Sequence, residues 1–136
     1  MFQLPNNEYS FYTKVVGEKT QEHLEGSFTV KCLLSQAELV EVAIRTEQYN
    51  QGTALPAQFA LINRAIAELE VRIIKSPTWW SERGNGRDLY DTNVVFHVFK
   101  EAFKAEEEWK KRIEDKVKEA ESRAKEPETK VAAEQK

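Results

Sequence analysis

Apolar and polar residues alternate with a period of two over the N-terminal third of the chain, as they do in a β-strand with one buried face. The run 9–16 is rich in aromatic and β-branched residues, and its odd positions share one side: Tyr9, Phe11, Thr13 and Val15. The run 27–34 places a second apolar set on one side: Phe28, Val30, Cys32 and Leu34. The two runs predict an antiparallel hairpin, in which Gly17 and Gly26 allow the strands to extend inward and shorten the connection.

The pattern changes to a helical period after Leu34. The sequence from Ser35 to Glu38 has the form of a capping box, which predicts a helix to about Asn50 with a C-terminal stop near Gly52. A second helix is predicted between a cap at Thr53 and the break at Pro77. Its apolar residues recur at intervals of three and four: Leu55, Phe59, Ile62, Ile66, Leu69 and Ile73. We expect the hairpin to pack on this helix through Phe28, Val30, Phe59, Ile66 and Leu69.

A third helix is predicted after an irregular segment over 76–91. Asp88 or Asp91 can cap it, and its apolar stripe runs from Val95 to Ala124. Because Glu and Lys alternate at helical spacings toward the C-terminus, we expect this helix to be long, charged and extended. The fold class is therefore predicted as α+β, with an N-terminal antiparallel β-hairpin followed by three helices. We expect a compact α+β domain over 1–110, a charged helical extension over 111–126 and a frayed or disordered tail over 127–136.

Composition and charge narrow the class of partner. The chain has 20 Lys and Arg against 23 Asp and Glu, a formal charge of −3, which supplies no general attraction for nucleic acid or anionic lipid. No apolar run approaches the roughly 20 residues needed to span a bilayer. The single cysteine excludes an internal disulfide and points to a reducing compartment. We therefore expect a soluble, unexported protein with neither a nucleic-acid nor a membrane partner.

Residues that could carry catalysis or bind a metal are few. Cys32 lies on the apolar side of a strand, where a buried thiol is far more common than a nucleophile. His97 has only Glu101 at a spacing that could share a metal, and a zinc or iron site needs at least three ligands. His23 stands beside Glu22 and Glu25 in a polar turn. The sequence predicts no catalytic residue, no cofactor and no metal site, and hence a protein that is not an enzyme.

Two groups of large apolar side chains could be part of the core or could bind a partner: the Trp79-Trp80 pair and the apolar stripe of the third predicted helix. Trp79 and Trp80 can close the core, or one of them can anchor a partner, since Trp is enriched at the centres of interfaces. Stacking on bases is a weaker alternative, because only Arg83 and Arg87 flank the pair. The stripe of the third helix, through Trp109 and Val117, exceeds what a hairpin and two helices can cover. It predicts self-association or a helical partner, the alternative being a solvated helix held by charged pairs.

The order of these features resembles that of the small tail assembly chaperones of long-tailed (siphovirus-type) bacteriophages. The matching residues are Met1-Phe2-Gln3-Leu4-Pro5, the strand 28–31, and Leu34 to Glu38 at the helix start. A second stretch is similar as well, from Ser76-Pro77-Thr78-Trp79-Trp80 to the segment 88–95 that opens the next helix. The resemblance covers roughly residues 1–110 and does not extend to the charged tail.

The resemblance implies a non-enzymatic chaperone in the host cell cytoplasm. It would bind the tape measure protein and keep it soluble until subunits of the tail tube protein, a further potential partner, polymerise around it. The residues expected to contact a partner or a neighbouring subunit are Trp79, Trp80, Phe99, Phe103 and Trp109. One alternative is a virion structural protein, such as a minor capsid, connector or decoration subunit, which would remain in the particle. Another is a bacterial adaptor or regulator unrelated to phage.

Overall fold

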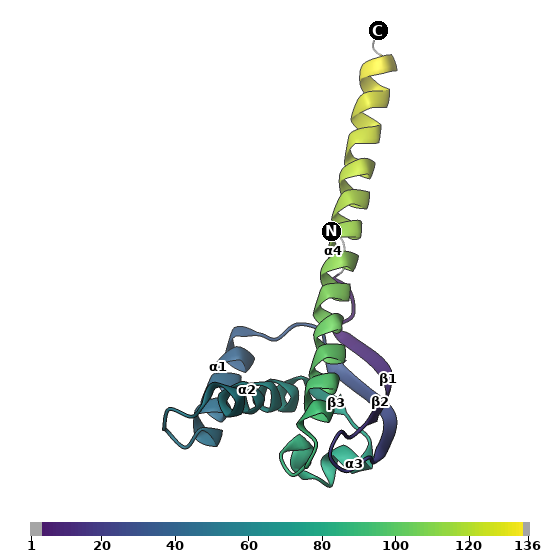
Figure 1. The fold of residues 1–136 in the computed structure, drawn as a ribbon. Helices are drawn as coiled ribbons and strands as arrows, with labels where there is room; N and C mark the ends of the chain where they lie inside the picture. Colours follow the sequence, from purple (N-terminus) through teal and green to yellow (C-terminus); the bar gives the residue numbers. More distant parts are fainter. Residues whose placement is uncertain (1–3, 135–136) are drawn as a thin grey trace.

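The computed structural model describes the backbone of residues 4–134 and the side chains of residues 4–124. Its elements follow in the order β1 (Glu8–Val16), β2 (His23–Lys31), α1 (Gln36–Tyr49), α2 (Ala57–Arg72), β3 (Ile73–Lys75), α3 (Thr78–Ser81), a 3₁₀ turn η1 (Gly84–Gly86) and α4 (Thr92–Glu134). The strands form one antiparallel sheet in the order β1-β2-β3. Figure 1 shows α1 and α2 on one side of α4 and the sheet on the other. The α+β class with an N-terminal antiparallel hairpin and a long last helix is confirmed.

The hairpin has one buried and one solvated face, as its alternation predicts. Strands β1 and β2 pair from Glu8 opposite Lys31 to Val16 opposite His23. β2 begins before Gly26, so the strands do extend inward and leave only residues 17–22 as the connection. The inner face buries Phe11, Thr13, Leu24, Phe28 and Val30. The outer face carries hydroxyl and charged side chains, among them Ser10, which shares a hydrogen bond of 2.9 Å with Thr29.

A third strand replaces the end of the predicted second helix. Ile73, expected as the last residue of the apolar helical face, is already extended and begins β3, which pairs with β2 beside Val30. The sequence Ile73-Ile74-Lys75 has two consecutive β-branched residues shortly before Pro77, and both features disfavour a helix. The strand edge of β2 supplies the backbone partners that a helix would otherwise have provided.

The capping box of α1 is present as predicted. The Glu38 amide donates to the Ser35 hydroxyl (3.2 Å), while the Glu38 carboxylate accepts from the Ser35 amide (2.9 Å). α1 ends at Asn50, and Gly52 follows in the left-handed region at a φ of 66°. The helix buries Val42, and polar groups tie it to α2: Glu70 accepts from Arg45 and from the hydroxyl of Tyr49.

Two expectations for α2 are wrong at its N-terminal end. The helix begins after Pro56 with no side-chain cap, and the Thr53 hydroxyl donates instead to the Asn50 carbonyl (2.9 Å). Phe59, expected in the core, is 51% exposed, because the buried residues of α2 lie in its later turns, where α4 packs on it. Ile66 and Leu69 are buried as predicted.

The segment expected to be irregular holds the short α3 and η1, which close the bottom of the core in Figure 1. Trp80 is fully buried, edge-on to Phe28 at 5.6 Å between ring centroids. A Cβ on Gly86 would lie 2.7 Å from the Trp80 indole, so only glycine allows η1 to approach so closely. Gly84 and Asn85 also adopt positive φ, as expected of a Gly-Asn-Gly turn.

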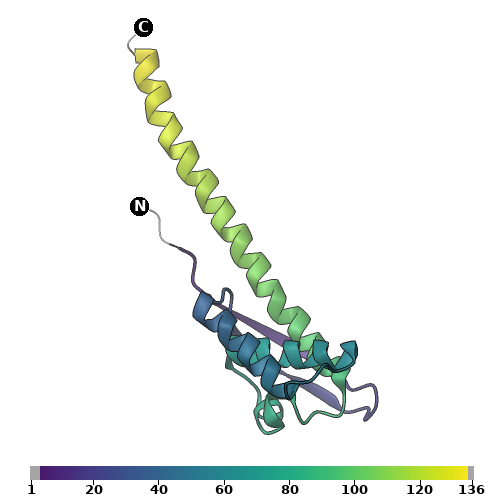
Figure 2. The same ribbon diagram turned by 90° about the vertical axis from the view of Figure 1, so that its left-hand side faces the viewer.

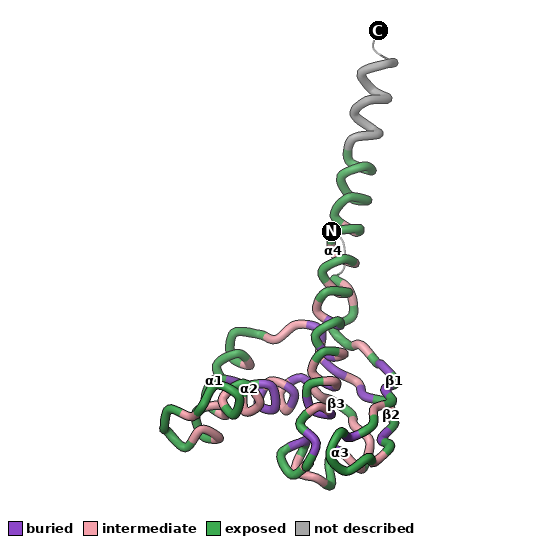
Figure 3. Tube along the Cα trace, in the orientation of Figure 1, coloured by how far each residue is buried: buried purple, intermediate pink, exposed green. Residues whose placement is uncertain are grey.

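α4 crosses the inner face of the sheet and then leaves the domain. Its first turns bury Val94, Val95, Val98, Ala102 and Ala105 against the sheet and α2. Figures 1 and 2 show the rest of the helix projecting away from every other element, and Figure 3 shows it mostly exposed, with half-buried positions only where it leaves the domain. The tail predicted over 127–136 lies outside the residues whose side chains are described and stays a prediction.

A buried arginine joins three elements where α4 leaves the domain. Arg72, 3% exposed, donates to the carbonyls of Lys31 (3.1 Å) and Cys32 (2.8 Å) at the end of β2. Its guanidinium also lies 3.5 Å from the carboxylate of Glu106 on α4 and 3.8 Å from that of Glu68 on α2. A buried charge needs such partners, so this cluster fixes where α4 crosses the end of α2.

Candidate partner-binding surface

Three phenylalanines on α4 form an apolar surface that the domain leaves partly open. Phe96, Phe99 and Phe103 are spaced by three and four residues, so they share one face of the helix. Phe99 and Phe103 stack at 6.4 Å between ring centroids. Phe99 packs partly against the core, whereas Phe96 and Phe103 are 42% and 43% exposed. We call these three residues the aromatic ridge.

Charged residues on α4 pair with one another along the helix. Lys104 pairs with Glu101 at 3.0 Å, Lys110 with Glu106 at 3.9 Å, and Arg123 with Glu119 at 2.9 Å. Such exposed pairs contribute only tenths of a kcal/mol each, but they support a helix that has no tertiary cover. The apolar stripe continues onto this projecting part through the half-buried Ile113 and the exposed Val117.

A second apolar surface lies on the outer side of α1. Leu39, Val40 and Ile44 are 44%, 47% and 48% exposed, while Val42 is the buried residue of this helix. The inward side of α1 places polar groups beside Val42, since Arg45 and Tyr49 bind Glu70 of α2. The helix thus presents its apolar side to solvent, the reverse of an ordinary amphipathic surface helix.

Trp109 lies where the N-terminal segment meets α4. Its indole Nε1 donates to the Pro5 carbonyl at 3.4 Å, and its ring is half-buried against the core. Beside it is an open hollow of about 360 Å³ lined by Leu4, Pro5, Asn7, Leu33, Leu34, Ser35, Glu38 and Trp109. One face of the indole therefore borders a largely apolar depression.

Trp79 and Trp80 belong to the body of the domain. Trp80 is 1% exposed, so a partner could reach it only if the core opened. Trp79 is half-buried beside Phe28, and its Nε1 donates to the Glu25 carbonyl at 2.9 Å. Together they pack α3 against the hairpin. Of the two roles that the sequence left open for this pair, closing the core and anchoring a partner, their positions fit the first.

The groups with potential chemistry are engaged in packing. Cys32 is fully buried, and this burial raises the pKa of its thiol despite the nearby Arg112. The ring of His97 shares a hydrogen bond of 2.6 Å with the Thr13 hydroxyl. Among the residues whose side chains are described, no three His, Cys, Asp or Glu gather as metal ligands would.

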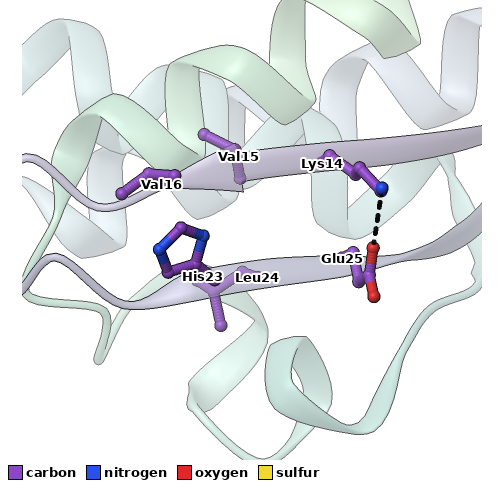
Figure 4. A pocket seen from close by; sticks show the side chains of 6 residues that line it. All are labelled: Lys14, Val15, Val16, His23, Leu24 and Glu25. Carbon is purple, nitrogen blue, oxygen red and sulfur yellow. Dashed lines mark ion pairs between the residues drawn. The ribbon is translucent and has the colours of Figure 1, made fainter.

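A further depression of about 380 Å³ lies at the turn end of the hairpin, drawn in Figure 4. It is lined by Lys14, Val15, Val16, His23, Leu24 and Glu25. Lys14 and Glu25 pair across the two strands at 3.6 Å. Its aliphatic walls are the exposed Val16, the half-buried Val15 and the buried Leu24, and no Ser, Thr or Cys nucleophile lines it.

The five residues expected to contact a partner are not brought together. Phe99 and Phe103 share the aromatic ridge, Trp109 lies further along α4, and the two tryptophans of α3 lie in the body of the domain. Sequence reasoning missed Phe96, although its spacing of three and seven residues from Phe99 and Phe103 indicated it. It also missed the outer side of α1, because apolar spacing indicates a helix but not which way its apolar side turns.

No helix in the described part of the chain is both long and apolar enough to cross a bilayer. Comparison of the chain with protein-family models, with curated proteins and with solved structures found no match. The candidate surface is accordingly defined by its own geometry: an aromatic ridge that continues into a projecting helix, with a second apolar side on α1.

Proposed function

We propose that this chain is a non-enzymatic tail assembly chaperone of a long-tailed bacteriophage. It binds the tape measure protein in the host cell cytoplasm and keeps it soluble until tail tube subunits polymerise around it. One observation carries the proposal: the aromatic ridge exposes Phe96 and Phe103 to solvent, with Phe99 half-buried between them, on a helix that continues beyond the domain.

The ridge suits a helical client. Aromatic side chains at i, i+3 and i+7 form a narrow apolar line, which packs between the side chains of a second helix. A long helical client with an exposed apolar stripe would aggregate unless that stripe were covered. The projecting part of α4 extends the contact line, and its paired charges keep the complex in solution.

Co-expression with the tape measure protein of the same phage tests the client. The double variant Phe96→Ser and Phe103→Ser removes the exposed rings of the ridge without adding charge. If the ridge holds hot-spot residues, affinity should fall by about 30-fold, the equivalent of 2 kcal/mol, and the tape measure protein should move to the insoluble fraction.

Tyr90→Ser is the matched control, because Tyr90 is an aromatic residue 79% exposed outside the ridge. It should leave the soluble yield of client unchanged. Equal soluble yields from the ridge variant and the wild type would contradict the proposal.

Mass spectrometry separates a chaperone from a structural subunit. A chaperone should be abundant in infected lysate and absent from purified particles. A stoichiometric copy number in particles would overturn the proposal in favour of a minor capsid, connector or decoration protein.

A further inference from the structure

The outer edge of β1 carries backbone groups that point away from the sheet. The Cys32 amide donates to the Asn7 carbonyl at 3.0 Å, and the Gly17 amide donates to the Glu22 carbonyl at 2.9 Å. These two bonds lie at opposite ends of the β1–β2 ladder and both involve odd-numbered residues on the β1 side. Because ladder bonds alternate along an antiparallel strand, the N–H and C=O groups of the even-numbered residues face the free edge.

Asn93 closes this edge at its hairpin end. Its side-chain amide donates to the Val16 carbonyl at 3.0 Å and accepts from the Glu18 amide at 3.1 Å. No other hydrogen bond to an outward backbone group of β1 occurs among the described residues. The open edge therefore comprises Glu8, Ser10, Tyr12 and Lys14, and an unpaired edge of this kind is a template for pairing with another chain.

We propose that the open edge of β1 binds the same edge of a second copy of this chain, antiparallel, with Glu8 opposite Lys14 of the second copy and Ser10 opposite Tyr12 of the second copy. This arrangement is two-fold symmetric about Phe11, as an interface between identical subunits requires. The two three-stranded sheets become one continuous sheet of six strands.

Charge complementarity across the sheet favours a second copy over other occupants. Lys14 already pairs with Glu25 of β2 at 3.6 Å, as Figure 4 shows, and Glu8 lies opposite Lys31 of β2. In the dimer, one row of the solvated face reads Glu25, Lys14, then Glu8 and Lys31 of the second copy. Lys14 and Glu8 of the second copy thus each have an opposite charge on both sides, and the symmetric row repeats this on the other half.

The same structure excludes the neighbouring registers. Sliding the second copy by two residues toward the turn would place Glu8 opposite Val16, whose outward carbonyl is already bonded to Asn93. Sliding it by two residues the other way would place Glu8 opposite Tyr12 and lose both ion pairs. The proposed register also sets the buried Phe11 against its own copy on the inner face, which extends the apolar layer across the two-fold axis.

A pair of charge reversals tests this register directly. Wild-type protein should show a concentration-dependent dimer in sedimentation equilibrium. Glu8→Lys and Lys14→Glu each turn two attractive cross-strand pairs into repulsive ones, so each should raise the dimer dissociation constant by about tenfold or more. Mixing the two variants restores both attractive pairs, and the mixture should dimerise while neither variant does so alone.

Glu18→Lys is the matched control, because it makes the same charge change on an exposed residue of the hairpin turn, outside the edge. It should dimerise like the wild type. A wild type that stays monomeric at several hundred micromolar, or a mixture no better than its components, would overturn the proposal.

Proline substitutions test the edge independently of charge. Tyr12→Pro removes an outward amide and should abolish the dimer with little loss of the β1–β2 ladder, whereas Thr13→Pro removes an inward amide and should unfold the hairpin. Circular dichroism and thermal melting establish that Tyr12→Pro is folded. Unchanged dimerisation of folded Tyr12→Pro would refute the edge pairing.

The dimerisation measurements contain no client, so a negative result would overturn the proposed dimer without bearing on the proposed chaperone function. If the wild type is monomeric and Tyr12→Pro instead loses the tape measure protein, the edge binds a client strand and the proposed dimer is wrong.

Discussion

The carboxylate of Asp91 occupies the space that a side chain on Gly17 would need. A Cβ built on Gly17 would lie 2.2 Å from Oδ2 of Asp91. The same carboxylate accepts from the Lys19 amide and from the Thr20 hydroxyl, each at 2.5 Å. These hydrogen bonds hold the pKa of Asp91 below its usual value. One side chain thus ties the turn of the hairpin to the start of α4, across more than seventy residues of sequence.

Gly17→Ala should therefore destabilise the protein. The added methyl must displace the Asp91 carboxylate from its hydrogen bonds, and overpacking of this kind costs about 1–3 kcal/mol in the free energy of unfolding. Urea denaturation measures the loss. In an Asp91→Ala background the nearest obstacle is gone and the Thr20 hydroxyl, 2.9 Å from the added Cβ, remains, so the same substitution should cost markedly less. Equal costs in both backgrounds would show that Asp91 is not the cause.

The capping box of α1 predicts a dependence of stability on pH. The hydrogen bond from Lys31, with those from Ser35, lowers the pKa of Glu38 from 4.5 to about 2. A carboxylate with a lowered pKa stabilises the fold fully above its unfolded-state pKa and loses that contribution as the pH falls through the folded value. The advantage of wild type over Glu38→Gln should thus be constant near neutral pH and shrink from about pH 5 toward pH 2.

Ser35→Ala provides the comparison for this experiment. It removes the neutral half of the capping box and should cost about 1 kcal/mol at neutral pH. Melting curves of the three proteins across the pH range measure both effects. A difference between wild type and Glu38→Gln that persists undiminished at pH 2 would contradict the assigned ion pair.

Two substitutions by aspartate on α2 should have opposite effects on stability. Ile66 is 5% exposed in the core cluster, so Ile66→Asp buries an unpaired charge whose cost approaches the whole stability of a small domain, and the variant should be unfolded. Leu61 on the same helix is 63% exposed, and Leu61→Asp should melt within a few degrees of wild type. Circular dichroism distinguishes the two, and a cooperatively melting Ile66→Asp protein would refute the core assignment.

Local patterns in the sequence were sufficient to predict most of the fold. Three features illustrate this: the alternation of Phe28 and Val30, the capping box at Ser35 and the helical apolar seam through Ile66. Each depends only on residues a few positions away or on the burial of an apolar face. Asp91 shows where that reasoning ends. Its position just before Thr92 predicted a cap for the last helix, but its carboxylate binds Lys19 and Thr20 instead. The competing amides come from the distant hairpin turn, which no local pattern reveals.

The candidate surface was harder to predict for the same reason. Apolar residues of α1 such as Val40 and Ile44 look like core positions until Glu70 of α2 is seen to bind the opposite side of that helix. Phe59 likewise has the spacing of a core residue, yet α4 covers only later turns of α2. Which apolar residues remain exposed depends on the lengths of distant elements and on where they cross. The spacing of apolar residues along one helix determines neither.

Two truncations separate the projecting helix from the domain. Arg112 of α4 contacts the body of the domain, its guanidinium lying 3.7 Å from the Cys32 sulfur, and Ile113 is half-buried. Truncation after Lys118 keeps both residues and should change the melting temperature by no more than a few degrees. Truncation after Lys110 removes both and uncovers Cys32 at the end of β2, so its free energy of unfolding should fall by about 1–2 kcal/mol.

Client binding by the same two proteins shows what the projecting helix contributes. The protein ending at Lys118 retains the aromatic ridge but lacks most of the extension, and we expect it to bind tape measure fragments more weakly than the full chain because the contact line is shorter. Calorimetric titration gives the two dissociation constants. Equal affinities would confine the binding surface to the ridge and the body, and equal stability of the two truncated proteins would show that Arg112 is dispensable for the fold.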